Sequence, residues 1–496
     1  MDLQDFKRVQ ARRQFLQQGA GVGMAALWQL LALEGRLGFA SGQSSYVNPL
    51  QPKVPHFAPR AKNVIYLFMA GGPSQIDLFD PKPELKKWEG QSLPESLTKD
   101  LRLAFIKPTA KIWASPRVFG RHGQCGMEFS DWLPHTATCA DDICMIRSMY
   151  TEQFNHTPGS LMMNCGTPLA GRPSIGAWTA YGLGSESENL PGYVVLISGF
   201  GEAGSKCWSN GFLSPSYQGV PFRSMGEPVL YLSSPAGISQ ETQRARLDAL
   251  RDLNHEHSID SGDLEIASRI ASYELAFRMQ TAAPELLDLS KEPSQILEKY
   301  GVNNNPDPSA LASGVQSRKY ATRFAMNCLL ARRMVERGVR FVHLVHGAWD
   351  HHTELNKKLK SACEMNDQPV AALLMDLKQR GLLDSTLVIW GGEFGRTPMV
   401  ETSRVLDGGS DSRGRDHHPF AFTVWMAGGG IRGGRVIGRT DELGINIVED
   451  KVHVHDLHAT VLHCLGLDHK RLTYRYQGRD FRLTDVGGSV VEKALA

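Results

Sequence analysis

The chain has 496 residues, of which 42% are hydrophobic and 21% charged, so it has ample apolar material for a large globular core. The formal net charge of +2 is close to balance and gives no indication of a nucleic-acid partner. Eight cysteines are scattered without a C-x-x-C pair, which argues against a zinc knuckle or a thioredoxin-type motif. A disulfide stays open as an alternative, and Cys139 and Cys144 are the closest pair in sequence.

Residues 1–40 have the features of an export signal. Arg12-Arg13 and Phe15-Leu16 precede an uncharged stretch from 19 to 33, and small residues follow at 38–40. This pattern predicts a twin-arginine signal and therefore a periplasmic or extracellular protein, with an amphipathic N-terminal helix as the alternative. The apolar stretch is short for a membrane span, so we expect no integral span in the mature chain. Residues 41–60 are polar and proline-rich, which indicates a linker.

The first strand of the body is predicted at 63–69, where an apolar run ends in the turn Gly71-Gly72-Pro73-Ser74. Asp77 and Asp80 follow within one helical turn. Glycines let the backbone approach a ligand, and carboxylates supply oxygen ligands for a metal. The alternative is that this turn, like most turns of its kind, only reverses the direction of the chain.

A helix start is predicted at Thr157-Pro158, after a helix-to-strand step that ends near 143–147. Free N–H groups and the helix dipole favour an anion at this position, so a Thr157 hydroxyl could serve as a nucleophile there. Capping of the helix by Thr157 is the alternative. A strand follows at 190–197, and the helical patterns 240–259 and 263–281 indicate a helical insertion at about 220–320.

The α/β alternation resumes with a helix at 320–337, a strand at 340–345, a helix at 370–380 and a strand at 387–390. The strand at 387–390 lies in LVIWGGEFGRTP, which presents Glu393 and Arg396 in a glycine-rich turn. Parallel strands joined by a crossover helix end at one edge of the sheet, so Asp350 and Glu393 are predicted to emerge together. An acid there can hold a metal and Arg396 can hold a tetrahedral oxyanion; an ordinary ion pair in a surface loop is the alternative.

Two pairs of adjacent histidines, here called doublets, lie at the borders of predicted strands. Asp350-His351-His352 follows one strand and Asp416-His417-His418 precedes another, at 420–426. Imidazoles mixed with carboxylates are a ligand set that zinc, manganese or iron accept. An amphipathic helix at 456–465 closes the body, and its His458 and His463 are expected on the helix surface or in local hydrogen bonds.

Several of these motifs resemble one family over nearly the whole mature chain. The matching pieces include GGPSQIDLFDPKP, NHTPGSLMMNCG, GRPSIGAWTAYGLGSE, GAWDHH, GGEFGRTP, GRDHHPFAFTVWMAGGGI, DLHATVLHCLGLDH and YQGRDFRLTD. They resemble the DUF1501 proteins within the alkaline phosphatase–sulfatase superfamily. The resemblance implies a three-layer αβα alkaline phosphatase-like domain over 61–490, with a mainly parallel central sheet and the helical insertion.

The resemblance also implies metal-assisted attack of a hydroxyl on a phosphate or sulfate ester. Gly392-Glu393-Phe394-Gly395 is similar to the superfamily's Ser-Asp-His-Gly turn, which makes Glu393 a metal ligand. By the same comparison Asp350, His352 and His417 are ligands, Asp77 is a weaker match, and Thr157 with His156 stands where the nucleophile helix starts.

The chain departs from the superfamily pattern in three places. Ala70-Gly71 stands where the first acid is expected, and Phe394 replaces a histidine ligand. The sulfatase signature is missing because the chain reads His156-Thr157-Pro158-Gly159, so no formylglycine forms there. One metal site rather than two, or a site without catalysis, follows from these changes.

The sequence therefore predicts an exported hydrolase of sulfate or phosphate esters that uses a divalent metal (zinc, calcium or manganese). The expected substrate is a small-molecule or polysaccharide ester. A non-catalytic periplasmic binding or scaffold protein with a degraded metal site is the main alternative, and a metal-dependent mutase or transferase is a third.

Overall fold

A computed structural model describes residues 48–94, 103–199, 201–224, 227–230, 232–235, 237–261, 264–302, 315–401 and 412–496. Its central element is a nine-stranded sheet in the order β12-β4-β11-β8-β1-β7-β5-β6, with β15 paired to β4. The strands of this sheet are β1 (Asn63–Met69), β4 (Ile143–Tyr150), β5 (Tyr193–Ser198), β6 (Val220–Phe222), β7 (Phe341–His346), β8 (Thr386–Gly391), β11 (Phe422–Ala427), β12 (Arg435–Ile437) and β15 (Val452–His453).

The sheet is mainly parallel. β1 pairs in parallel with β7 on one side and with β8 on the other, and β5 continues the parallel arrangement beyond β7. β11 alone runs against its neighbours β4 and β8. The carboxyl ends of β1, β7 and β8 therefore meet at one edge, which is the position predicted for the acid-bearing turns.

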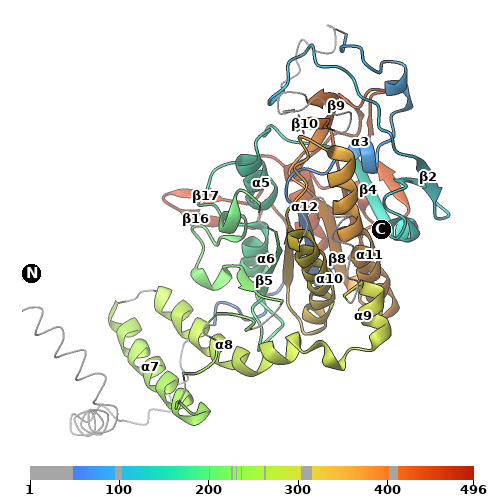
Figure 1. Cartoon of the computed structure of the whole chain (residues 1–496). Coiled ribbons are helices and arrows are strands. Elements are labelled where there is room, and N and C mark those ends of the chain that lie inside the picture. The colour runs from blue at the N-terminus through green and yellow to red at the C-terminus, as the bar shows by residue number, and fades with distance from the viewer. Residues whose placement is uncertain are drawn as a thin grey trace, which may run out of the picture. The chain divides into compact units, whose positions relative to one another are not determined.

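Helices cover both faces of the sheet (Figure 1). On β1, Ile65 and Leu67 belong to one buried cluster, whereas Tyr66 and Phe68 belong to the cluster on the opposite face. Side chains alternate across a strand, so a strand buried on both faces needs this continuous apolar run. The first cluster includes α10 (Val315–Glu336) and α11 (Leu355–Gln379), and the second includes α5 (His156–Cys165), α6 (Ile175–Leu183) and α12 (Val454–Cys464). The predicted three-layer α/β class is confirmed.

Shorter elements complete the described part of the chain. The stretch predicted as a helical insertion contains α7 (Gln240–Ser261), α8 (Leu264–Leu287) and α9 (Ser294–Tyr300). Near the sheet edge lie α3 (Gln75–Leu78) and the two-stranded sheet of β9 (Gly395–Glu401) and β10 (Gly414–His418). The other two-stranded sheets are β2 (Phe119–His122) with β3 (Met127–Ser130), β13 (Arg439–Thr440) with β14 (Ile447–Glu449), and β16 (Tyr474–Tyr476) with β17 (Arg479–Phe481).

One helix begins much earlier than the sequence predicts. The predicted helix at 370–380 starts after Pro369, but α11 begins at Leu355 and carries Pro369 inside it. Proline removes one helical hydrogen bond, which makes it a common helix boundary. Here Leu355, Leu359 and Ala362, all before the proline, are buried in the core, so tertiary packing outweighs the local cost.

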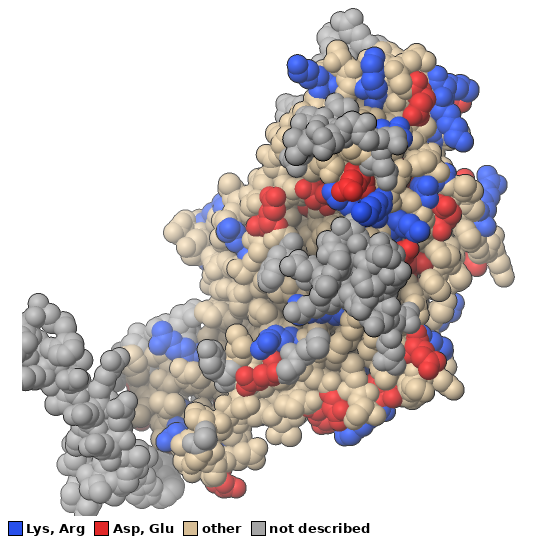
Figure 2. Space-filling model, in the orientation of Figure 1, with Lys and Arg blue, Asp and Glu red and all other residues tan. Residues whose placement is uncertain are grey.

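All eight cysteines are free thiols, so the Cys139–Cys144 disulfide left open by the sequence is not formed. The predicted export signal at 1–40 lies outside the described residues. Within the described part of the chain, none of the helices combines the length and apolar character that crossing a membrane requires. Lys and Arg are interspersed with Asp and Glu on the face shown in Figure 2.

Candidate metal centre

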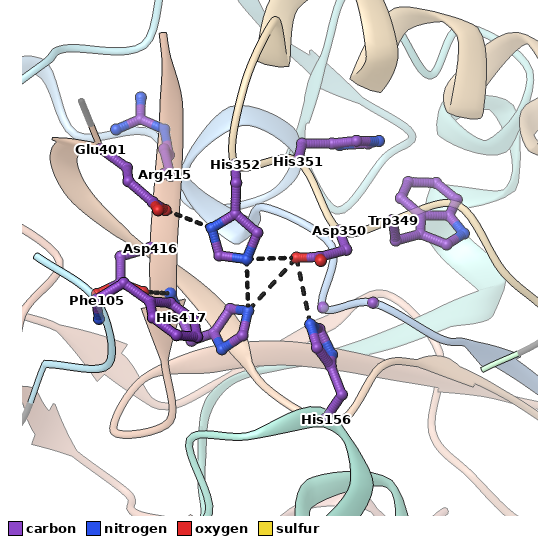
Figure 3. Close-up of polar contacts among 12 residues, drawn as sticks. Phe105, His156, Trp349, Asp350, His351, His352, Glu401, Arg415, Asp416 and His417 are labelled. Atoms are coloured by element: carbon purple, nitrogen blue, oxygen red, sulfur yellow. Dashed lines mark hydrogen bonds and ion pairs between the residues drawn. The ribbon is translucent and has the colours of Figure 1, made fainter. Parts of the chain in front are cut away.

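Four side chains from three separate parts of the chain converge beyond the carboxyl edge of the sheet (Figure 3). Asp350 and His352 follow β7, His156 is the first residue of α5, and His417 lies on β10. The potential ligand atoms of these four residues all lie within 4.8 Å of one another.

The distances centre on one oxygen, Oδ1 of Asp350. It lies 3.2 Å from Nε2 of His156, 2.8 Å from Nε2 of His352 and 3.4 Å from Nε2 of His417. The Nε2 atoms of His352 and His417 are 3.0 Å apart. Three imidazole nitrogens and one carboxylate oxygen thus face a common point.

Each of the three imidazoles is oriented by a hydrogen bond from its Nδ1 to an acceptor elsewhere in the chain. Nδ1 of His156 donates to Oε1 of Glu393 at 2.7 Å, and Nδ1 of His417 donates to the carbonyl of Phe154 at 2.7 Å. Nδ1 of His352 donates to Oε2 of Glu401. With the proton held at Nδ1, the lone pair of each neutral ring is at Nε2 and points into the cluster.

This arrangement fits a metal ion. Lone pairs on His352 and His417 at 3.0 Å repel each other unless a proton or a cation stands between them. Nε2 of His156 is buried without a hydrogen-bond partner of adequate geometry among the described residues. Bonds of about 2.0–2.2 Å place tetrahedral ligands about 3.3–3.6 Å apart, so a small outward shift of the ligands would admit zinc.

The electrostatics of the cluster point to the same need for positive charge. Burial by itself raises the pKa of Asp350, but the three neighbouring imidazoles, in the forms that carry a proton at Nε2, and the charge of Arg396 hold it well below its usual range. Burial lowers the pKa of His156, yet its bonds to Asp350 and Glu393 outweigh this and raise it to about 9. Burial and the nearby Arg396 lower the pKa of His417 to about 3. The Asp350 carboxylate therefore stays ionised and attracts a proton or a cation to the cluster.

Of the residues predicted as ligands, Asp350, His352 and His417 are brought together. Glu393 lies directly behind them: its two oxygens accept the Gly71 N–H at 3.0 and 3.1 Å, and Oε1 also accepts from His156. The remaining members of the two doublets point elsewhere, because Nε2 of His351 bonds the Ala348 carbonyl at 2.9 Å and Nε2 of His418 bonds that of Ile445 at 2.9 Å.

Asp77, also predicted as a ligand, is not among the clustered groups of the described residues. Its carboxylate forms a buried ion pair with Arg415, with Oδ2 2.8 Å from Nε and Oδ1 3.2 Å from NH2. Ser74 donates to the same carboxylate at 2.5 Å. Burial works against the ionised form, but Arg415 and the hydrogen bonds outweigh it and lower the pKa of Asp77. This pair connects α3 to β10, the strand that carries His417.

The predicted anion-binding residue, Arg396, is fully buried and bonds the protein itself. Its Nε donates to the Gly72 carbonyl at 2.9 Å, its NH1 to the Arg415 carbonyl at 3.0 Å, and its NH2 to the Gly71 carbonyl and to Asp350 at 2.6 Å. These bonds tie the turn after β1 to the Asp350 turn. Thr157 is the second residue of α5, next to His156, and its side chain is half-buried; the residue at the cap position is Asn155.

Sequence reasoning missed Glu401 and the carbonyl of Phe154, which orient His352 and His417. Glu401 lies 49 residues after His352 and ends β9, with no motif around it that indicates a histidine partner. An acid that is fully buried on a strand is a sign of a functional role, and Glu401 is such an acid. Its burial becomes visible only when β9 is paired with β10, where Glu401 lies opposite Gly414.

No curated protein matches the chain significantly. Solved structures similar to the chain include the lipoteichoic acid synthase LtaP from Listeria monocytogenes, at 9% identity and a TM-score of 0.38 over 90% of this chain and 80% of that one. They also include the PsFucS1 sulfatase from Pseudoalteromonas sp., at 11% identity and 0.33 over 82% and 68%. The alkaline phosphatase from the Antarctic bacterium TAB5 matches at 12% identity and 0.28 over 76% and 92%.

A family model described as "Protein of unknown function (DUF1501)" matches residues 61–495, which is nearly all of the chain outside its first 60 residues. The chain belongs to the DUF1501 family.

Proposed function

We propose that the protein is an exported, metal-dependent hydrolase of sulfate or phosphate esters. The observation that carries the proposal is the convergence of three oriented imidazoles and Asp350 on one point. The proposed ligands are His156, Asp350, His352 and His417. This set includes His156 and leaves out Glu393 and Asp77. Glu393 accepts a hydrogen bond from His156 instead, and Asp77 forms an ion pair with Arg415.

The donor types favour zinc or manganese over calcium. Three imidazole nitrogens suit a transition metal, whereas calcium prefers six to eight oxygen ligands. A metal bound here would act as a Lewis acid toward the oxygen of a phosphate or sulfate ester. The centre can be reached from solvent because the side chain of Asp350 is 38% exposed, although the three imidazoles around it are nearly buried.

The surrounding residues would hold the ligands and supply the nucleophile. Glu393 and Glu401 keep protons at Nδ1 of His156 and His352, so that Nε2 stays directed at the centre. Arg396 positions Asp350 through its 2.6 Å bond rather than binding substrate. Thr157 stands at the start of α5, where N–H groups without helical partners favour the developing negative charge, and we assign its hydroxyl as the nucleophile.

Metal analysis and turnover measurements on the purified protein test the proposal. We expect about one zinc or manganese per chain and turnover of p-nitrophenyl phosphate or p-nitrophenyl sulfate. His417→Ala should lose the metal. Thr157→Val should keep the metal but lower kcat by about a thousandfold or more, while Thr157→Ser retains part of the activity. Full activity of Thr157→Val would remove Thr157 from the mechanism, and metal-free wild-type protein after reconstitution would refute the centre.

One observation favours the second candidate, a non-catalytic binding or scaffold protein. Four protein ligands fill a tetrahedral shell, as in structural zinc sites, whereas catalytic sites keep one position open. The same measurements distinguish the two candidates: bound metal without turnover of either ester supports the scaffold protein.

A further inference from the structure

A buried carboxylate connects one proposed ligand to a loop beside the centre. Oδ2 of Asp416 accepts three consecutive backbone N–H groups, those of Ala104 at 3.1 Å, Phe105 at 2.8 Å and Ile106 at 3.1 Å. Its Oδ1 accepts the N–H of His417 at 2.8 Å. Successive N–H groups around one anion form a concave nest, and hydrogen bonds to an ionised acceptor are stronger than neutral ones. Asp416 therefore fastens residues 104–106, which we call the strap, to the strand that carries His417.

The strap packs against the rings of two proposed ligands. The Phe105 ring lies in T-shaped contact with the imidazoles of His352 and His417, with centroids 5.4 Å apart in both cases, and Figure 3 shows it beside His417. Both imidazoles are also held at Nδ1, by Glu401 and by the Phe154 carbonyl. Neither ring can turn away from the centre without breaking its hydrogen bond at Nδ1 and losing its contact with Phe105.

The freedom of these rings to turn limits how fast a metal can exchange. A metal held by four ligands leaves only after several of its bonds have broken, and an imidazole that cannot turn away binds it again before it diffuses out. The Phe105 contacts need no metal, so they restrain the rings before uptake as well as before release. Two aromatic contacts of typical strength would slow both steps by about tenfold or more, and they would leave the equilibrium affinity nearly unchanged.

We propose that the strap is a retention device, which slows the exchange of a divalent transition metal such as zinc at the centre. Phe105 restrains the two imidazoles, and Asp416 is a positioning residue that holds the strap in place. The inference rests on the proposed function, because it requires a metal between the proposed ligands. For an exported protein such a restraint has a use, since it keeps a metal that was loaded during folding in place after the protein has crossed the membrane.

Zinc kinetics on the full chain test the inference without any substrate. An excess of a chromophoric chelator gives the rate constant of release from zinc-loaded protein, stopped-flow mixing gives that of uptake, and a competition titration gives the Kd. Phe105→Ala should raise both rate constants about tenfold or more and leave the Kd within about threefold, whereas Phe105→Tyr should keep the wild-type rates. Asp416→Asn should also speed release. Asp141→Asn is the matched control, because Asp141 likewise accepts successive N–H groups, those of Gln124 and Cys125 at 2.9 Å each, but belongs to none of the clustered groups of the described residues.

Failure of the strap and failure of the proposed function give different results. If Phe105→Ala releases zinc at the wild-type rate, or if it weakens the Kd without speeding uptake, the strap is overturned while the proposed function stands. If reconstituted wild-type protein binds no zinc or manganese, the proposed function is overturned together with the strap. Phe105 is 46% exposed, so its replacement by alanine is compatible with folding, and a thermal melt of the metal-free variant that matches wild-type protein shows that the change in rate is local.

Discussion

Replacing Glu393 by glutamine probes the orientation of His156 with little change in shape. In the structure Oε1 of Glu393 accepts from Nδ1 of His156 at 2.7 Å, and both carboxylate oxygens accept the Gly71 N–H, at 3.0 and 3.1 Å. A glutamine oxygen at the Oε1 position could still accept both donors. The amide nitrogen would then face the Gly71 N–H, and the negative charge behind the imidazole would be lost.

The expected magnitude follows from these contacts. Residues that orient metal-bound histidines typically contribute about 10- to 100-fold to metal affinity. We expect Glu393→Gln at the lower end, about tenfold or about 1.4 kcal/mol, because only the charge is removed. Glu393→Ala should reach about 100-fold, and it should also lower the free energy of unfolding of the metal-free protein by about 1–3 kcal/mol, because the buried Gly71 N–H loses its acceptor.

Competition with a chromophoric chelator gives the zinc Kd, and urea unfolding of metal-free protein gives the stability. Glu152→Gln is the control, because Glu152 also accepts from a histidine, His453 at 3.1 Å, but belongs to none of the clustered groups. If Glu393→Gln and Glu393→Ala both bind zinc within twofold of wild-type protein, then either His156 is not a ligand or its orientation does not depend on Glu393.

Three further predictions concern the fold around the centre. Burial lowers the pKa of His343 and of His458 to about 3, against about 6.5 when unfolded, so the unfolded chain binds protons first as the pH falls. The free energy of unfolding therefore keeps its full value above about pH 6.5 and falls as the pH drops toward 3. Urea unfolding should show a loss of about 2 kcal/mol per histidine at pH 5, and the free energy of unfolding of His343→Gln should depend less steeply on pH. Asp77→Ala leaves Arg415 buried without its carboxylate and should cost about 3–5 kcal/mol in urea unfolding, whereas Asp77→Ala with Arg415→Met should recover part of the loss; equal stability of Asp77→Ala and wild-type protein would show that the pair is dispensable. A thiol reagent should modify about one cysteine per native chain, Cys125, and all eight after denaturation, because the other seven are buried; rapid reaction of several thiols in native protein would contradict this burial.

Local sequence patterns were sufficient to predict the core of the fold. The run at 63–69 is β1 residue for residue, and the runs at 340–345 and 387–390 correspond to β7 and β8 within one or two residues. Strands buried on both faces need an uninterrupted series of apolar residues, and few other elements of this length do. The beginning of α11 was beyond such reasoning, since a helix that continues through Pro369 depends on the core that it packs against.

The site was predictable in its membership but less so in its geometry. Asp350, His352 and His417 could be proposed because of where they stand relative to predicted strands. Asp350 and His352 follow β7, and His417 precedes β11. Their partners could not: Glu401 meets His352, and Glu393 meets His156, only after β9 and α5 have been placed against the sheet. Arg396 and Asp77 carry the charges expected of site residues, yet the tertiary structure surrounds them with carbonyls and with Arg415.

The sequence by itself determined that parallel strands bring Asp350 and Glu393 to one edge, because the apolar runs mark the strands and the helix that connects them makes the two strands parallel, so that both end at the same edge. The family resemblance pointed to His352 and His417, but the physical reason why these histidines of the two doublets face the centre lies in the tertiary structure. Adjacent side chains differ in direction by the backbone angles of a turn or a strand, so His352 and His417 point inward while His351 and His418 bond the carbonyls of Ala348 and Ile445. Those angles are set by the packing of the whole domain, which no short motif contains.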